Sequence, residues 1–111
     1  MEARMHIIDV WVNCPDEDVA DAISDALIEE RLAACANVFP SINSSYRWKG
    51  TVEKENEIPL LLKTRADHFV AVCKRVRELH PYETPSIIGL KLEFVDPDYA
   101  QWVLEETEAA H

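Results

Sequence analysis

The feature that most restricts the fold of this chain is a pair of extended segments in its middle. Ile42–Trp48 and Thr51–Thr64 are both rich in residues that favour strands, and Lys49-Gly50 between them is the best hairpin turn in the sequence. Pro59 within the second segment suggests a bulge or a free edge. The sequence therefore predicts a hairpin that is unusually long for a chain of 111 residues.

Strand and helix patterns precede this hairpin in a regular order. His6–Asn13 alternates in the manner of a strand. Acidic residues from Asp16 onward then begin an amphipathic helix over residues 16–30, because negative charge is favourable at a helix start. Leu32–Phe39 follows, and we assign it to a strand because Pro40 cannot continue a helix.

A similar order continues after the hairpin. Residues from Thr64 onward form a second amphipathic helix, which Pro81 ends. Ser86–Phe94 alternates between apolar and charged residues, as expected of a half-buried strand. Its alternating apolar positions are Ile88, Leu90, Leu92 and Phe94. Asp96-Pro97 then caps a short terminal helix.

The resulting order, β-α-β-β-α-β with one further helix, is the split-βαβ order of ferredoxin-like proteins. We predict an α+β fold in one domain, residues 1–111, with an antiparallel four-stranded sheet and both helices on one face. It includes a long hairpin between the second and third strands and a short C-terminal helix. The opposite face must still bury Trp11, Tyr46 and Trp48. Because a long hairpin also exposes strand edges, we expect the chain to oligomerise through that face and those edges.

Charge and cysteine content disfavour several classes of protein. A formal net charge of −10 repels phosphate backbones, so we expect no nucleic-acid partner. Neither a membrane span nor a signal peptide is visible in the sequence. The three cysteines are odd in number and form no CxxC motif, which disfavours a disulfide scaffold and a closed zinc knuckle. We therefore expect a cytoplasmic protein with no membrane partner.

Five segments carry a more specific signal. They are Arg31–Val38, Tyr46–Gly50 with Glu53 and Glu57, Leu62–Thr64, the double-proline loop His80–Pro85, and Tyr99–Trp102. Together they cover nearly the whole chain, and they resemble the CutA divalent-cation tolerance family. The resemblance implies a ferredoxin-like subunit, related in shape to the PII signalling proteins, that assembles as a homotrimer. It also implies a link to divalent-cation tolerance, with copper binding described for bacterial members.

Cys14 and His80 are the candidate metal ligands. A thiolate with an imidazole suits copper, and zinc less selectively. The resembling copper sites use a cysteine at the Cys14 position and two adjacent histidines before Pro-Tyr, whereas this chain has Leu79-His80 and so lacks one histidine. Glu83 is the candidate for a further ligand, and its oxygen would favour a harder ion. These groups need not meet within one subunit, but they can meet across a cleft of the trimer.

The metal-ligand candidates also have structural interpretations. Cys14 fits a small buried hydrophobic residue, and His80 fits a cap at the C-terminus of a helix. Of the other cysteines and histidines, we expect two in the core, Cys35 and Cys73, and two at the surface, His68 and His111.

Three more residues are candidates for a cleft or an interface. Tyr82 lies on the loop held by two prolines, where rigid polar groups serve either recognition or a subunit contact. Trp48 is expected to anchor an interface rather than to hold a ligand. Lys63, with Arg65, could receive an anion at a strand end, but we favour a salt bridge to an acidic neighbour.

These observations favour a metal-responsive homotrimer, a divalent-cation tolerance protein that binds copper or another divalent cation. The alternative is a PII-like small-ligand sensor, or a trimeric adaptor for an unidentified protein partner, with no metal role. Few glycines and little clustered basic charge count against a nucleotide. An enzyme with Cys14 as nucleophile and His80 as base is disfavoured, since the sequence offers no orienting third residue and no oxyanion device.

Overall fold

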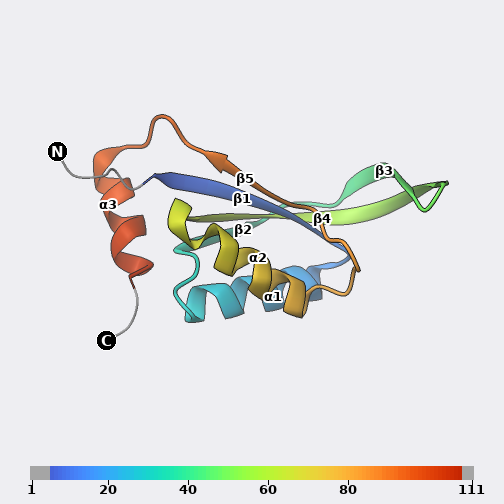
Figure 1. The fold of residues 1–111 in the computed structure, drawn as a ribbon, viewed down its shortest axis with the longest axis horizontal. Coiled ribbons are helices and arrows are strands. Elements are labelled where there is room, and N and C mark those ends of the chain that lie inside the picture. The colour runs from blue at the N-terminus through green and yellow to red at the C-terminus, as the bar shows by residue number, and fades with distance from the viewer. Residues whose placement is uncertain (1–5, 109–111) are drawn as a thin grey trace.

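The structure, a computed structural model, describes residues 6–108. Its elements are β1 (Ile7–Cys14), α1 (Glu17–Glu29), β2 (Cys35–Val38), β3 (Ile42–Trp48), β4 (Thr51–Arg65), a 3-10 turn (Ala66–His68), α2 (Phe69–Leu79), β5 (Ile87–Lys91) and α3 (Pro97–Glu106). Figure 1 shows α1 and α2 on one face of the sheet, the β3–β4 hairpin extending beyond it at one end, and α3 at the other. The predicted α+β fold is confirmed, but the sheet has five strands rather than four, because the predicted second strand is divided around Pro40 into β2 and β3.

The sheet has the strand order β2-β4-β1-β5, with antiparallel neighbours throughout, and β3 continues the β2 edge along the outer part of β4. The central position of β1 and the antiparallel pairing are those of the predicted ferredoxin-like arrangement. The break between β2 and β3 falls around Pro40, as predicted. At the hairpin tip, Lys49 and Gly50 take φ angles of 51° and 83°, the left-handed values that this turn requires.

The core lies between the sheet and the two long helices. Alternate residues of β1 point toward the helices, and Val10 and Val12 are fully buried there. On β4, Leu60 and Leu62 occupy the matching positions. The helices contribute their own buried apolar stripes, chiefly Ile23, Leu27, Val72 and Val76. This arrangement fixes the sheet in place and leaves its other face uncovered by α1 and α2 (Figure 1).

The last strand differs from the prediction in length and in the face it buries. It spans Ile87–Lys91 rather than residues 86–94, because its partner β1 begins at Ile7. The last hydrogen bond between the two segments runs from Leu92 N to the Ile7 carbonyl at 3.0 Å. Ile87 packs against the core, whereas Ile88 is 54% exposed. The apolar set chosen from the sequence therefore lies mainly away from the helices; Leu90 is 49% and Phe94 89% exposed.

The expected core positions of two cysteines are also wrong. Cys35 and Cys73 are both half-buried. On β2 the neighbouring Ala36 packs against the core, so Cys35 points the other way, and Cys73 lies at the edge of the buried stripe of α2. His68, expected at the surface, is half-buried, and His111 lies outside the described residues.

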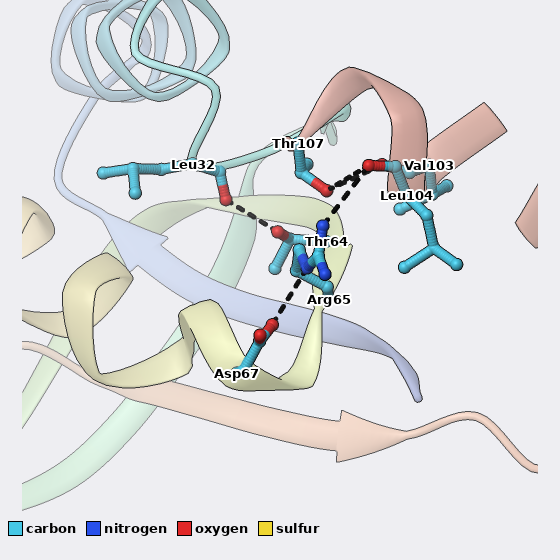
Figure 2. Close-up of polar contacts among 7 residues, drawn as sticks. All are labelled: Leu32, Thr64, Arg65, Asp67, Val103, Leu104 and Thr107. Atoms are coloured by element: carbon cyan, nitrogen blue, oxygen red, sulfur yellow. Dashed lines mark hydrogen bonds and ion pairs between the residues drawn. The ribbon is translucent and has the colours of Figure 1, made fainter. Parts of the chain in front are cut away.

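The C-terminal helix is held by arginine and threonine side chains (Figure 2). Arg65 donates from Nη1 to the Leu104 carbonyl at 3.4 Å and from Nε to Asp67 Oδ1 at 2.9 Å. Thr107 donates from Oγ1 to the Val103 carbonyl at 2.7 Å. The Thr107 bond lies within α3, whereas Arg65, whose cationic group is favourable at a helix C-terminus, attaches α3 to the end of β4. Across residues 6–108, no helix has the length and apolar character needed to cross a membrane.

Candidate functional site

A cleft of about 760 Å³ lies between the β3–β4 hairpin and the loop that follows α2. Asn13, near the end of β1, lies at its inner end, and residues 82–86 form the loop wall. The hairpin wall carries aromatic and acidic side chains, namely Tyr46, Trp48, Glu53, Glu55 and Glu57. The cleft therefore combines flat apolar surfaces with concentrated negative charge.

His80 lies beside the inner end of this cleft. It follows the last residue of α2, where its backbone N–H bonds to the Val76 carbonyl, as predicted for a helix cap. Its ring Nδ1 accepts a bond from the Tyr82 backbone N–H at 3.2 Å, so Nε2 carries the proton and donates to the Asn13 carbonyl at 2.7 Å. Both ring nitrogens thus fix the loop against β1.

Cys14 is the residue next to this contact, and it is buried in the core with no exposed surface. Burial, reinforced by the charges of Asp16 and Glu57, raises the pKa of its thiol from the ordinary 9.0 to about 12. The thiol is therefore protonated at neutral pH. This is the structural interpretation offered for Cys14 above, and a metal ion would have to displace its proton.

Glu83 lies at the outer end of the cleft, close to the hairpin tip. Its carboxylate is 3.5 Å from Lys49 Nζ, and both side chains are highly exposed. The same Lys49 ammonium lies 5.5 Å from the centre of the Trp48 ring, in a cation–π contact. Trp48 itself is 36% exposed.

Tyr82 bridges the loop and the hairpin across the cleft. Its hydroxyl donates to Glu55 Oε1 at 3.2 Å. Burial, the bond to Glu55 and the nearby carboxylates raise the pKa of Tyr82 strongly, and burial with the same carboxylates raises that of Tyr46. Both phenols are therefore neutral donors facing acceptors.

Lys63 is not part of the cleft. Its ammonium lies 2.7 Å from Asp9 Oδ1 on the face of the sheet away from the helices, and Arg65 pairs with Asp67. The favoured salt-bridge interpretation of both residues is confirmed.

The sequence-predicted metal ligands are close in the fold but do not form a ligand set within one chain. His80 bonds to the residue before Cys14, yet both of its nitrogens are occupied, and Glu83 is paired with Lys49. Within the part of the chain that the structure describes, no three histidine, cysteine, aspartate or glutamate side chains are arranged to hold a metal ion.

Sequence reasoning missed the acidic wall of the cleft. Glu53, Glu55 and Glu57 all line it from β4. Glu53 and Glu57 contributed only to the family resemblance, and Glu55 was not singled out. The signal was present, because glutamate at every second position of a strand places all of its carboxylates on one face.

The comparisons with known proteins concern the family and the fold, and they cover most of the chain. Residues 8–106 match the family model described as "CutA1 divalent ion tolerance protein". The chain belongs to the CutA1 family. It is 43% identical over 98 residues to the divalent-cation tolerance protein CutA of Thermus thermophilus, covering 88% of this chain and 95% of that protein.

Two further CutA relatives show how much of each protein is matched. Protein CutA of Mus musculus is 42% identical over 99 residues, which cover 89% of this chain but only 56% of the mouse protein. The chain thus spans little more than half of that relative. The structure of the "Periplasmic divalent cation tolerance protein CutA" of Archaeoglobus fulgidus superposes with a TM-score of 0.89 at 31% identity, covering 92% of this chain and 99% of that one.

Proposed function

We propose that this chain is a divalent-cation tolerance protein that binds divalent metal ions, copper among them, and that it works as a homotrimer. Membership of the CutA1 family supports the tolerance role. The observation that carries metal binding is that His80 bonds at 2.7 Å to the residue before Cys14, which makes an imidazole and a thiol neighbours at the inner end of the cleft. A metal ion held there would have to replace the hydrogen bonds of His80 and the proton of Cys14, and Glu83 would have to leave Lys49 to join them.

The homotrimer is proposed because, in a single chain, one face of the sheet exposes apolar side chains and the metal-ligand set is incomplete. The face away from α1 and α2 exposes Ile88 and Leu90 to about half of their surface, beside Trp11 and Phe39, whose rings contact each other at a tilt. Apolar surface of this kind is stabilised when a second chain covers it. A neighbouring chain could also supply a ligand that completes the set around His80.

A binding role is proposed rather than a catalytic one. With a pKa of about 12, the Cys14 thiol contains almost no thiolate at neutral pH, and thiolate is the nucleophilic form. The three cysteines are free thiols, which suits a reducing compartment, and we propose the cytoplasm. Because the Archaeoglobus relative is described as periplasmic, fractionation of the native cells is the direct check of this location.

The assembly is tested first. Sedimentation equilibrium should give three times the chain mass of 12.7 kDa at low micromolar concentration. Trp11→Ala, on the uncovered face, should shift the distribution toward the single chain, whereas Trp102→Ala on α3 should not. A folded single chain as the main species of the native protein would contradict the proposal.

Metal binding is tested by calorimetry with copper under anaerobic conditions. His80→Gln and Cys14→Ala should each weaken copper binding at least tenfold, because each removes one ligand. Cys73→Ala is the matched control, since it removes a half-buried free thiol elsewhere in the fold. If His80→Gln and Cys73→Ala bind copper equally well, His80 is not a ligand and the proposed site is wrong.

A further inference from the structure

The acidic wall of the cleft is a ladder of three carboxylates, and its spacing is the starting point. Glu53, Glu55 and Glu57 lie on one face of β4, and all three line the cleft. Residues two apart on a strand are separated by roughly 7 Å, since each residue advances the chain by about 3.4 Å. The carboxylates are therefore distributed along a line rather than gathered around a point.

The innermost carboxylate indicates that this wall is built to receive a positive charge. Glu57 is only 5% exposed, and its side chain lines the cleft. Among residues 6–108, no hydrogen bond or ion pair reaches its carboxylate. The rest of the side chain is buried while its carboxylate oxygens stay accessible from the cleft, so a cation that enters the cleft can pair with them.

The geometry fits an extended organic cation better than a metal ion. Ca²⁺ and Mg²⁺ need several oxygen ligands within about 2.0–2.6 Å of one centre, which a linear ladder does not provide. The opposite wall and the tip supply aromatic surfaces, Tyr82 and Trp48, that can cover methylene groups. The cleft therefore complements a ligand whose positive charges are spaced along a chain and separated by apolar segments.

The chain already contains one example of the contact. The Lys49 side chain, an alkylammonium, lies over the Trp48 ring at 5.5 Å and pairs with Glu83 at 3.5 Å, at the outer end of the cleft. The same two groups could hold the terminal ammonium of a ligand in place of Lys49.

We propose that the cleft binds a linear aliphatic polyamine, with its ammonium groups on the Glu53–Glu55–Glu57 ladder and its methylene chain against the aromatic side chains. Lys49 competes with the ligand for the outer position. This goes beyond the proposed metal role and does not depend on it, because the ligand contains no metal and, of the three metal-ligand candidates, only Glu83 contacts it.

Calorimetry of the full chain with spermidine in 0.15 M NaCl tests the proposal. We expect saturable binding of one spermidine per chain. Glu55→Gln should weaken it about twofold to fivefold, as for an exposed ion pair, and the near-isosteric Glu57→Gln about tenfold, as for a buried one. The exposed Glu93→Gln removes the same charge outside the cleft and should leave binding unchanged.

A pair of lysine variants tests the competition by an effect of the opposite sign. Lys49→Gln should tighten spermidine binding, because it frees Glu83 and Trp48. Lys54→Gln, next to the ladder but on the other face of β4, makes the same change in net charge and should have little effect.

Two results would overturn the polyamine site. One is equal binding by Glu55→Gln and Glu93→Gln, and the other is displacement of spermidine by Mg²⁺ at matched ionic strength. Either would reduce the effect to diffuse attraction of cations to a protein of net charge −10.

Discussion

The two halves of β4 form one continuous strand in two different environments. The inner half, Ile58–Arg65, lies between β1 and β2 under the helices, and Leu60 and Leu62 have no exposed surface. The outer half, Thr51–Glu57, pairs only with β3, and Val52 is 54% exposed. The inner half thus stabilises the fold, while the outer half presents side chains to the cleft.

This difference separates stability from function along one strand. A strand buried on both faces reads as a nearly continuous apolar run, as Leu60–Leu62 does: Leu60 and Leu62 face the helices, and Leu61 on the other face, paired with Trp11, is only 8% exposed. A strand with a single neighbour and no covering layer can alternate freely, and here the alternation places glutamates on one face. Substitutions in the two halves should therefore have separable effects.

The largest expected effect follows from deleting buried volume in the inner half. Leu62→Ala should lower the free energy of unfolding by about 2–5 kcal/mol, because it leaves a cavity in the core. Val52→Ala in the outer half should cost less than about 0.5 kcal/mol. Urea unfolding at one fixed protein concentration measures both, since assembly makes stability depend on concentration. Similar losses for both variants would mean that the hairpin is as tightly packed as the body.

Substitution of the two glycines, Gly89 in the body and Gly50 at the hairpin tip, should destabilise the fold for two different reasons. A Cβ at Gly89, in β5 of the body, would lie 2.8 Å from Phe69 Cε1, so Gly89→Ala should cost about 1–3 kcal/mol through overpacking. At the hairpin tip, a Cβ on Gly50 would meet nothing within 4 Å, but φ is +83° there, and Gly50→Ala should cost about 1 kcal/mol through backbone strain.

A second substitution distinguishes these two causes. Phe69→Ala should reduce the additional cost of Gly89→Ala, because it removes the atoms that clash, and should leave the cost of Gly50→Ala unchanged. The four unfolding energies of each double-mutant cycle give this coupling. Additive costs for Gly89 and Phe69 would contradict the clash.

The ion pair in the body of the fold should have a larger coupling energy than the ion pair at the hairpin tip. Lys63 and Asp9 are 21% and 15% exposed in their side chains, whereas Lys49 and Glu83 are 70% and 71% exposed. A double-mutant cycle with Lys63→Gln and Asp9→Asn should give a coupling of about 1–2 kcal/mol. The cycle with Lys49→Gln and Glu83→Gln should give less than about 0.5 kcal/mol. Equal couplings would show that burial does not distinguish the two pairs.

Sequence patterns predicted the body well because its elements follow simple periods. The alternation of β1 and the apolar stripes of both long helices identified most core positions correctly. Pro40 correctly indicated the break after β2. The last strand was harder. Its alternation cannot say which set faces the helices, since this depends on its register with β1, where Gly89 is opposite Val10.

The candidate site was predictable only in part, for a related reason. The double-proline loop and His80 stand out in the sequence, but the bonds from His80 to Asn13 and Tyr82 depend on where α2 ends in three dimensions. The acidic ladder becomes a cleft only when that loop faces the hairpin. Local pattern therefore indicates the residues, and tertiary contacts decide which of them act together.

The smallest effect at neutral pH concerns Cys14, which lies opposite Ile58, where the two halves of β4 meet. Its pKa is raised from 9.0 to about 12 in the folded chain, so below pH 9 the thiol is protonated in both states and titration contributes nothing. Between pH 9 and 12 the unfolded chain releases this proton and the folded chain keeps it, so stability falls as the pH rises.

Urea unfolding of the wild type and Cys14→Ala at pH 8, 9.5 and 11, under reducing conditions, isolates this contribution. The raised pKa values of the three tyrosines and of Cys73 affect both proteins alike, so the difference in stability between the two proteins reports Cys14. The wild type should be the more stable at pH 8, and its advantage should shrink by pH 11. An advantage that stays constant would mean that the thiol ionises as easily in the folded chain as in the unfolded one, and that the point where the hairpin leaves the body is open to water.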